Sequence, residues 1–217
     1  CNKYPNVFLK PVNGSMGRGI IRISRCGDGT YQCHETGLSG FRKQSYPTLA
    51  KVYAAISGKM KARKYLIQQG LNLITFGSRP IDFRALVQKN GNGRWAITSI
   101  VARTAGVNHF VSNLARGGTI STVGEALSRS QVSANAQTIA ARLRNAAIEI
   151  AQGLENRIAG HFGELGVDLA VDRQGKVWLL EVNSKPSKGD NTPPLSSGKI
   201  RPSVNQIVNY ARYLSGF

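Results

Sequence analysis

Short apolar runs and one long amphipathic stretch organise this chain into predicted strands and helices. Runs at residues 7–12 and 20–23, separated by glycine and polar residues, predict two strands joined by a glycine-rich loop. Apolar residues recur at helical spacing over residues 49–56, and residues 65–68 return to a strand pattern. The first third of the chain therefore predicts a small unit of strands and one helix.

The rest of the chain shows a second set of strands followed by a long helix. Residues 84–87 and 95–101 alternate around Asn-Gly-Asn-Gly at residues 90–93, which is a strong hairpin signal. From residue 133 to 160, apolar residues recur at three- and four-residue steps, and this spacing predicts a long amphipathic helix. A shorter helix is expected over residues 204–214. These patterns predict an α+β protein with antiparallel sheets.

The change of pattern between residues 69 and 74 predicts a division into two lobes. We expect a small lobe at residues 1–71 and a larger lobe at residues 72–217. Ligand sites are common at the junction of two domains. A ligand is therefore expected in a cleft between the lobes.

Near the end of the chain, two strand-like runs flank a polar turn signal at residues 172–175. We expect a four-residue turn that pairs Val171 with Lys176. That register would set Asp168 opposite Leu179.

Three side chains that carry oxygen, Asp168, Glu181 and Asn183, would then share one face of this hairpin. Side chains alternate faces with period two, and diagonal neighbours lie about 7–8 Å apart. Mg²⁺ prefers carboxylate and amide oxygens together with substrate phosphates. The pattern therefore indicates a magnesium site, although an ordinary amphipathic hairpin with its polar face in water shows the same alternation.

The net charge of the chain predicts an anionic partner. The 217 residues include 29 Lys and Arg but only 11 Asp and Glu, which gives a net charge of +18. Nucleic acid, anionic lipid, a nucleotide and an acidic peptide would all be attracted. An aromatic content of 7% and the lack of a recognisable reading motif argue against nucleic acid.

Membrane insertion and export are not expected from the composition. No apolar stretch approaches the roughly 18–20 residues that a membrane span needs, and no signal peptide opens the chain. Cys1, Cys26 and Cys33 are an odd number without the spacing of a disulfide framework. We therefore expect a cytoplasmic protein.

The glycine-rich loop is a second candidate for phosphate chemistry. Residues 13–19 match no Walker motif, and no helix pattern follows as a Rossmann turn would require. A glycine loop between two strands can instead fold over phosphates and offer backbone N–H groups, with Lys10 adding a positive charge. A plain turn is the alternative interpretation.

Taken in order, several segments resemble the ATP-grasp superfamily, and in particular its YheC/YheD-type, spore-coat-associated branch. The resemblance extends over roughly residues 7–186. The segments that carry it are residues 8–11, 14–20, 68–70, 82–84, 113–118 and 181–184.

The resemblance implies ATP clamped between two α+β lobes, with ATP and Mg²⁺ as cofactors. Lys10 would contact the phosphates. The residues expected to close over the phosphates are Ser15, Met16, Gly17, Arg18 and Gly19. Those expected to hold the adenine are Gln68, Gln69, Gly70 and Leu71. Those expected near the transferred phosphoryl group are Arg84, Arg103 and Asn113, and the implied magnesium ligands are again Asp168, Glu181 and Asn183.

The implied activity is that of an ATP-dependent carboxylate–amine ligase. Such an enzyme forms an amide through an acyl-phosphate and releases ADP and phosphate. The carboxylate and amine substrates are not specified, although the charge suggests an acidic peptide. The alternatives are a nucleotide-binding structural protein of the spore without turnover and a basic nucleic-acid-binding protein. The resemblance also implies an N-terminal domain before residue 1, so we expect the chain to be a piece of a longer protein.

Overall fold

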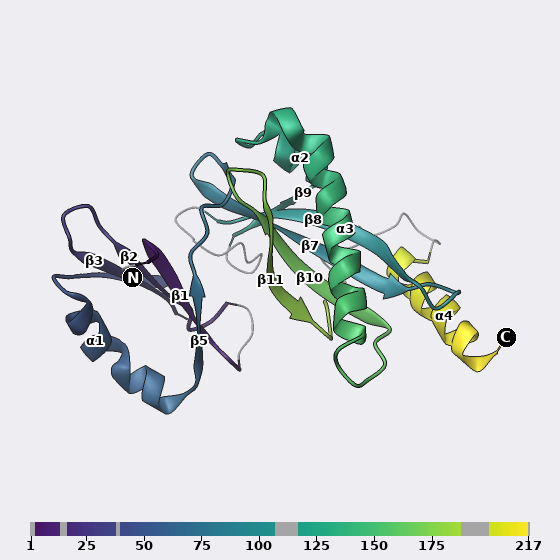
Figure 1. The fold of residues 1–217 in the computed structure, drawn as a ribbon, viewed down its shortest axis with the longest axis horizontal. Helices are drawn as coiled ribbons and strands as arrows, with labels where there is room; N and C mark the ends of the chain where they lie inside the picture. Colours follow the sequence, from purple (N-terminus) through teal and green to yellow (C-terminus); the bar gives the residue numbers. More distant parts are fainter. Residues whose placement is uncertain (1–2, 14–16, 38–39, 107–116, 188–199, 217) are drawn as a thin grey trace. The chain divides into compact units, whose positions relative to one another are not determined.

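The chain folds into two compact units, Cys1–Asn72 and Leu73–Phe217 (Figure 1). The structure is a computed structural model, and it describes residues 3–13, 17–37, 40–106, 117–187 and 200–216. Each unit combines an antiparallel sheet with helices, which confirms the α+β class. The units divide one residue beyond the boundary drawn from the sequence, and the roles expected of the two lobes stay predictions.

Unit 1 is a five-stranded antiparallel sheet with one helix, α1. The strands follow the order β4-β3-β2-β1-β5 across the sheet. The strand bounds are β1 Asn6–Pro11, β2 Ile21–Arg25, β3 Tyr31–Thr36, β4 Phe41–Tyr46 and β5 Tyr65–Gln69. The helix α1 spans Leu49–Ala62, and it begins where the Thr48 side chain accepts a hydrogen bond from the backbone N–H of Lys51.

One face of the unit 1 sheet packs against α1. Leu9 and Ile21 point from the strands into a small core that Val52 and Ile56 of α1 complete. Because side chains alternate along a strand, Lys10 lies on the other face of the sheet. The core therefore fixes which residues of β1 are left for other contacts.

Unit 2 is a six-stranded antiparallel sheet covered by helices. Five strands follow the order β11-β10-β7-β8-β9, and β6 pairs with β7. The strand bounds are β6 Thr75–Phe76, β7 Arg79–Lys89, β8 Trp95–Thr104, β9 Thr119–Ser121, β10 Glu164–Val171 and β11 Val177–Asn183. The helices are α2 Val123–Ser128, α3 Ala136–Glu155 and α4 Pro202–Ser215.

The long helix α3 supplies much of the unit 2 core. Its buried residues Ile139, Leu143, Ala147 and Ala151 recur every four residues and so form one stripe. Figure 1 shows α3 lying across the sheet, where this stripe packs with the apolar residues of the strands. The helix was predicted over residues 133–160, but it begins after a short 3₁₀ turn and ends at Glu155.

The alternation along β7 separates the two faces of the unit 2 sheet. Phe83 and Ala85 are buried in the core on the side of α3. Asp82 and Arg84 alternate with them and therefore point to the opposite face. Farther along that face, the buried Gln88 donates a hydrogen bond of 3.0 Å to the backbone carbonyl of Ser203 in α4. The opposite face thus carries charged residues at one end and packs against α4 at the other.

Among the described parts of the chain, no helix combines the length and the apolar character that crossing a membrane requires.

Candidate functional site

The turn of the β10–β11 hairpin differs from the turn predicted from the sequence. The backbone N–H of Asp172 donates to the carbonyl of Lys176 at 3.0 Å, so three residues, not four, form the loop. Gly175 occupies the left-handed region at φ +79°, as such loops require. Val171 consequently pairs with Val177, and the expected pairing of Val171 with Lys176 is wrong.

A bulge farther along the hairpin shifts the register by one more residue in the same direction. Leu169 pairs with Leu179, but the next pair along is Asp168 with Glu181, so Leu180 is the extra residue. The expectation that Asp168 lies opposite Leu179 is therefore also wrong. Directly opposed residues share a face, with Cβ atoms about 4.5–5.5 Å apart. The Cβ atoms of Asp168 and Glu181 thus lie closer together than they would in the predicted diagonal arrangement.

Asn183 falls on the same face as these two carboxylates. It pairs with Gly166, two residues before Asp168 in β10 and therefore of the same parity. Asp168 is buried, Asn183 is half-buried, and Glu181 is exposed. The register thus leaves the three expected magnesium ligands on one side of the hairpin, while their binding of a metal stays a prediction.

A network of two arginines and two carboxylates occupies the centre of this face. Arg84 is the direct β7 partner of Asp168, and its Nε and Nη2 bind the two carboxylate oxygens, with 2.7 Å between Nη2 and Oδ2. Arg103 in β8 is the direct partner of Asp82 and donates to it from Nε at 2.7 Å and from Nη2 at 3.0 Å. The Nη2 atom of Arg103 also lies 3.1 Å from Oδ2 of Asp168.

Burial makes the charge balance of this network important. The relative exposure of Asp82, Arg103 and Asp168 is 8%, 9% and 6%. Burial by itself would lower the pKa of Arg103, but the two neighbouring carboxylates raise it above its ordinary value. Arg103 therefore stays charged, and the network holds two positive and two negative groups.

The donor set fits a hard divalent cation by its chemistry. Asp168, Glu181 and Asn183 offer carboxylate and amide oxygens, and Mg²⁺ often binds through one or two carboxylates plus substrate phosphates. Within the described ranges, no cluster of three or more His, Cys, Asp or Glu side chains is arranged around a common point. A metal here would thus depend on two carboxylates, one amide and a bound phosphate. It would also share Asp168 with Arg84 and Arg103.

In unit 1, the described part of the glycine-rich loop is fixed to β3 by Thr36. The hydroxyl of Thr36 donates to the carbonyl of Gly17 at 2.7 Å and accepts from the backbone N–H of Ile20 at 2.9 Å. The backbone N–H of Gly19 adds a bond of 3.0 Å to the Thr36 carbonyl. Gly17 and Gly19 have φ values of +65° and +71°, which favour glycine. The turn around Arg18 is therefore held at both ends.

The residues expected to contact adenine do not all share one face. Gln68 pairs with Phe8 and thus lies on the same side of the sheet as Lys10. Gln69 pairs with Val7 and points to the opposite side. These assignments follow from the register, and the roles of the residues stay predictions.

Gly70 meets β1 at very short range. Its backbone N–H donates to the carbonyl of Asn6 at 2.8 Å, and a Cβ atom on Gly70 would lie 2.5 Å from the Cβ of Asn6. Only glycine fits this approach. Leu71 follows without belonging to a strand or helix.

Three of the predicted site residues, Ser15, Met16 and Asn113, lie outside the described residues. Of the others, the structure brings together Arg84, Arg103 and Asp168 by direct contact. Sequence reasoning gave no role to Asp82 or Thr36. For Asp82, the signal was its alternation with Arg84 within residues 80–87, which are otherwise apolar.

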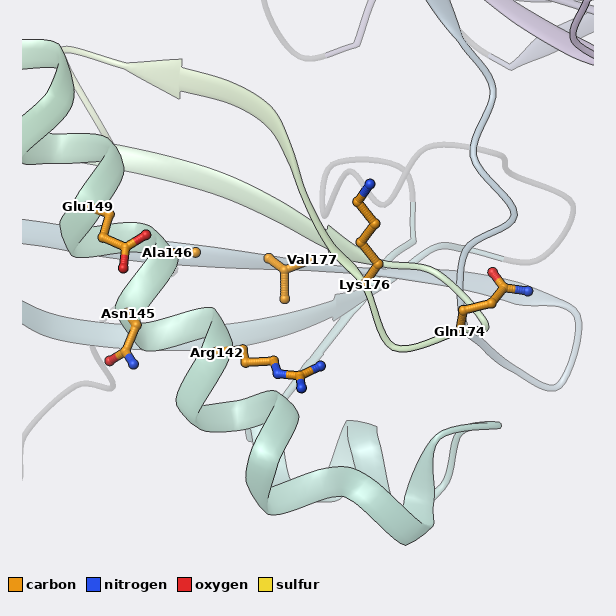
Figure 2. A pocket seen from close by; sticks show the side chains of 7 residues that line it. All are labelled: Arg142, Asn145, Ala146, Glu149, Gln174, Lys176 and Val177. Carbon is orange, nitrogen blue, oxygen red and sulfur yellow. The ribbon is translucent and has the colours of Figure 1, made fainter.

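A pocket of about 480 Å³ lies on the other side of unit 2, against α3. It is lined by Arg142, Asn145, Ala146, Glu149, Gln174, Lys176 and Val177. Figure 2 shows that Lys176 and Gln174 point away from the helix, so the polar groups do not converge on one point. The pocket contains none of the predicted site residues.

A family model described as YheC/D-like ATP-grasp matches residues 1–214 of this chain. The chain belongs to the YheC/D-like ATP-grasp family. The family resemblance predicted from the sequence, and with it the ATP-grasp fold, is therefore confirmed.

Two curated relatives of this YheC/D-like chain come from Bacillus subtilis (strain 168). It is 32% identical over 215 residues to the endospore coat-associated protein YheD, covering 99% of this chain and 47% of that protein. It is 26% identical over 194 residues to the endospore coat-associated protein YheC, covering 86% of this chain and 50% of that protein. The YheC/D-like chain thus spans about half the length of the curated relatives it matches.

Among solved structures, the YheC/D-like chain is similar to the C-terminal domain from K. lactis Pby1, an ATP-grasp enzyme interacting with the mRNA decapping enzyme Dcp2. The sequence identity is 17% and the TM-score is 0.47. The match covers 96% of this chain and 54% of that one.

Proposed function

We propose that this chain is the ATP-binding and catalytic part of an ATP-dependent carboxylate–amine ligase. Membership of the ATP-grasp family supports ATP as the ligand and ligation as the reaction class. The observation that carries the proposal is the charged face of unit 2. There Asp168 lies between Arg84 and Arg103 and directly opposite Glu181.

The reaction begins when a carboxylate oxygen of the substrate attacks the γ-phosphorus of ATP and the bond to the ADP oxygen breaks. An amine then attacks the acyl carbon of the resulting acyl-phosphate, loses a proton and displaces phosphate. Both steps require that negative charge be neutralised around the transferring group. No covalent nucleophile on the protein is needed.

In this proposal, two guanidinium groups of unit 2 meet this requirement. Arg84 and Arg103 lie on adjacent strands, and their contacts with Asp168 fix their orientation. Nε and Nη2 of both arginines already donate to carboxylates, so their remaining N–H groups would meet the phosphate oxygens. Because the donors are held in place before the substrate arrives, they stabilise developing charge without reorganisation.

Unit 1 also carries residues that this proposal assigns to nucleotide binding. Lys10 contacts phosphate, the turn at Gly17 and Arg18 offers backbone N–H groups, and Gln68 lies on the face that Lys10 shares. Asp168, Glu181 and Asn183 hold Mg²⁺, which supplies positive charge to the phosphates. We also propose the association with the endospore coat that the names of the two curated relatives describe.

The substrates are proposed only by class. Lys and Arg outnumber Asp and Glu by 29 to 11, so an acidic peptide suits the charge of the chain as the second substrate. The carboxylate would come from this peptide or from the amino acid joined to it.

The test is ADP release from Mg-ATP in the presence of a panel of amino acids and acidic peptides. We expect at least one acceptor to stimulate release by the wild-type chain. Arg84→Lys keeps the charge but loses the forked contact, so stimulation should fall strongly. Arg142→Lys changes an exposed arginine on α3 and is the matched control, which should behave like wild type.

A second candidate is a structural protein that binds nucleotide without turnover. Two observations favour it: the relatives are coat-associated, and Asp168 is already bound by two arginines. Tight binding of Mg-ATP with no release of ADP under any acceptor would support this function and contradict the ligase.

A further inference from the structure

Asp82 lies beside the proposed reaction centre and has no role in the chemistry above. It sits on β7 two residues before Arg84, and it is the direct partner of Arg103 across the ladder to β8. Its relative exposure is 8%. A buried carboxylate needs charged or hydrogen-bonding partners, and both of its oxygens accept from Arg103.

Arg103 divides its donors unequally between two carboxylates. Its Nε serves Asp82 alone, at 2.7 Å. Its Nη2 is shared, at 3.0 Å from Oδ2 of Asp82 and 3.1 Å from Oδ2 of Asp168. The forked pair therefore belongs to Asp82, and Asp168 receives a single, longer contact from Arg103.

Removal of the Asp82 charge would change this division. Asp168 would be the remaining carboxylate that the described residues place within reach of Arg103. The network would then hold two guanidinium groups against one buried carboxylate, and both would be drawn to Asp168. A cation that binds Asp168 would have to compete with this stronger attraction.

We propose that Asp82 is a positioning residue that holds Arg103 and thereby limits its attraction to Asp168, the carboxylate expected to bind a divalent cation. The inference rests on the proposed function, because it assumes that Asp168 is a metal ligand. It adds that the cation affinity of the site depends on a carboxylate that does not touch the cation.

The experiment measures Mn²⁺ binding to the full chain by electron paramagnetic resonance, with a non-hydrolysable ATP analogue at saturation. Asp82→Asn should weaken Mn²⁺ binding by about tenfold or more, the range found when residues that orient metal ligands are changed. Glu164→Gln is the control, because it removes a carboxylate from the same strand as Asp168 at a distance of four residues. It should bind Mn²⁺ like wild type.

A double variant separates positioning from general damage. Adding Arg103→Met to Asp82→Asn removes the competing guanidinium, so Mn²⁺ affinity should recover toward the wild-type value. A merely structural role for Asp82 predicts no recovery. Asp82→Glu keeps the charge and should lose less affinity than Asp82→Asn, and this comparison remains open if the double variant does not fold.

The outcomes distinguish this inference from the proposed function. If the wild-type chain binds no Mn²⁺ in the presence of the analogue, both fail. If the wild-type chain binds Mn²⁺ and Asp82→Asn binds it equally tightly, the proposed function stands and the role of Asp82 is overturned. An equal loss for the asparagine and glutamate variants, without recovery in the double variant, would also overturn it.

Discussion

Thr36 offers a direct test of how the glycine-rich turn of unit 1 is held in place. Its hydroxyl group bonds the carbonyl of Gly17 and the backbone N–H of Ile20, so one side chain fixes both ends of the turn. Replacement by valine keeps the shape of the side chain and removes both bonds. The backbone bond from Gly19 to the Thr36 carbonyl does not depend on the side chain and should remain.

The expected cost follows from burial and hydrogen-bond number. Thr36 is only 2% exposed, so water replaces the lost hydroxyl poorly. A buried polar group without a partner costs about 1–3 kcal/mol. Gly17 and Ile20 are themselves half-buried and recover part of that cost from water. We therefore expect the free energy of unfolding to fall by about 1–2 kcal/mol in Thr36→Val.

Urea unfolding and nucleotide titration check this prediction together. Thr36→Ser keeps the hydroxyl and is the matched control. We expect Thr36→Val to lower both the urea midpoint and the affinity for Mg-ATP, while Thr36→Ser retains most of the affinity. If the Thr36→Val and Thr36→Ser variants bind nucleotide equally well, the Thr36 hydroxyl does not position a phosphate-binding turn, and this prediction is refuted.

Two further substitutions address unit 2. Glu181 is exposed, so Glu181→Gln should change the free energy of unfolding by less than about 0.5 kcal/mol. The same substitution should weaken Mg²⁺-dependent nucleotide binding. A large loss of stability would instead indicate a structural role. Burial raises the pKa of Glu155, but hydrogen bonds from Lys89 and Trp95 outweigh it and hold the pKa below its ordinary value. The stability that Glu155 contributes is therefore complete above about pH 4.3 and is lost as the pH falls through the lowered value. Glu155→Gln should remove this part of the acid destabilisation in urea unfolding curves recorded between about pH 3 and pH 6, and an unchanged pH profile would contradict the assignment.

The β10–β11 hairpin shows what the alternation of side chains along a strand can predict and what it cannot. The face shared by Asp168, Glu181 and Asn183 was predicted correctly from the sequence, although the turn and the register were not. The three-residue loop shifts the pairing by one residue, and the bulge at Leu180 shifts it by one more in the same direction, so the face is restored but the partner of Asp168 is not the expected one. A bulge depends on how the strand pairs with its neighbours, and no local pattern of apolar residues predicts it.

The helices and edge strands show a similar limit. The long amphipathic stripe of α3 was predicted because its period is repeated along most of a 20-residue helix. In contrast, β4 has the mostly polar sequence Phe-Arg-Lys-Gln-Ser-Tyr at the edge of the unit 1 sheet, and it forms through pairing with β3. The short helix α2 was also missed, although Thr122 and Glu125 form a capping box at its start.

The contacts among the buried charged residues were the part of the site that the sequence predicted least well. Arg84 and Arg103 were named from the resemblance, and Asp168 from the hairpin pattern as well, but the sequence does not show that both arginines meet at the Asp168 carboxylate. Asp82 had no assigned role, because its function depends on a partner 21 residues away across the β7–β8 ladder. Such contacts come from the order of strands in the sheet, which local pattern does not specify.

Calorimetric titration of the wild-type chain with a non-hydrolysable ATP analogue, in excess Mg²⁺ and again in excess EDTA, shows whether the chain binds nucleotide through a metal. We expect one nucleotide to bind per chain, with an affinity that is strongly weakened when the metal is removed. Binding of equal strength with and without Mg²⁺, or no binding at all, would contradict this expectation.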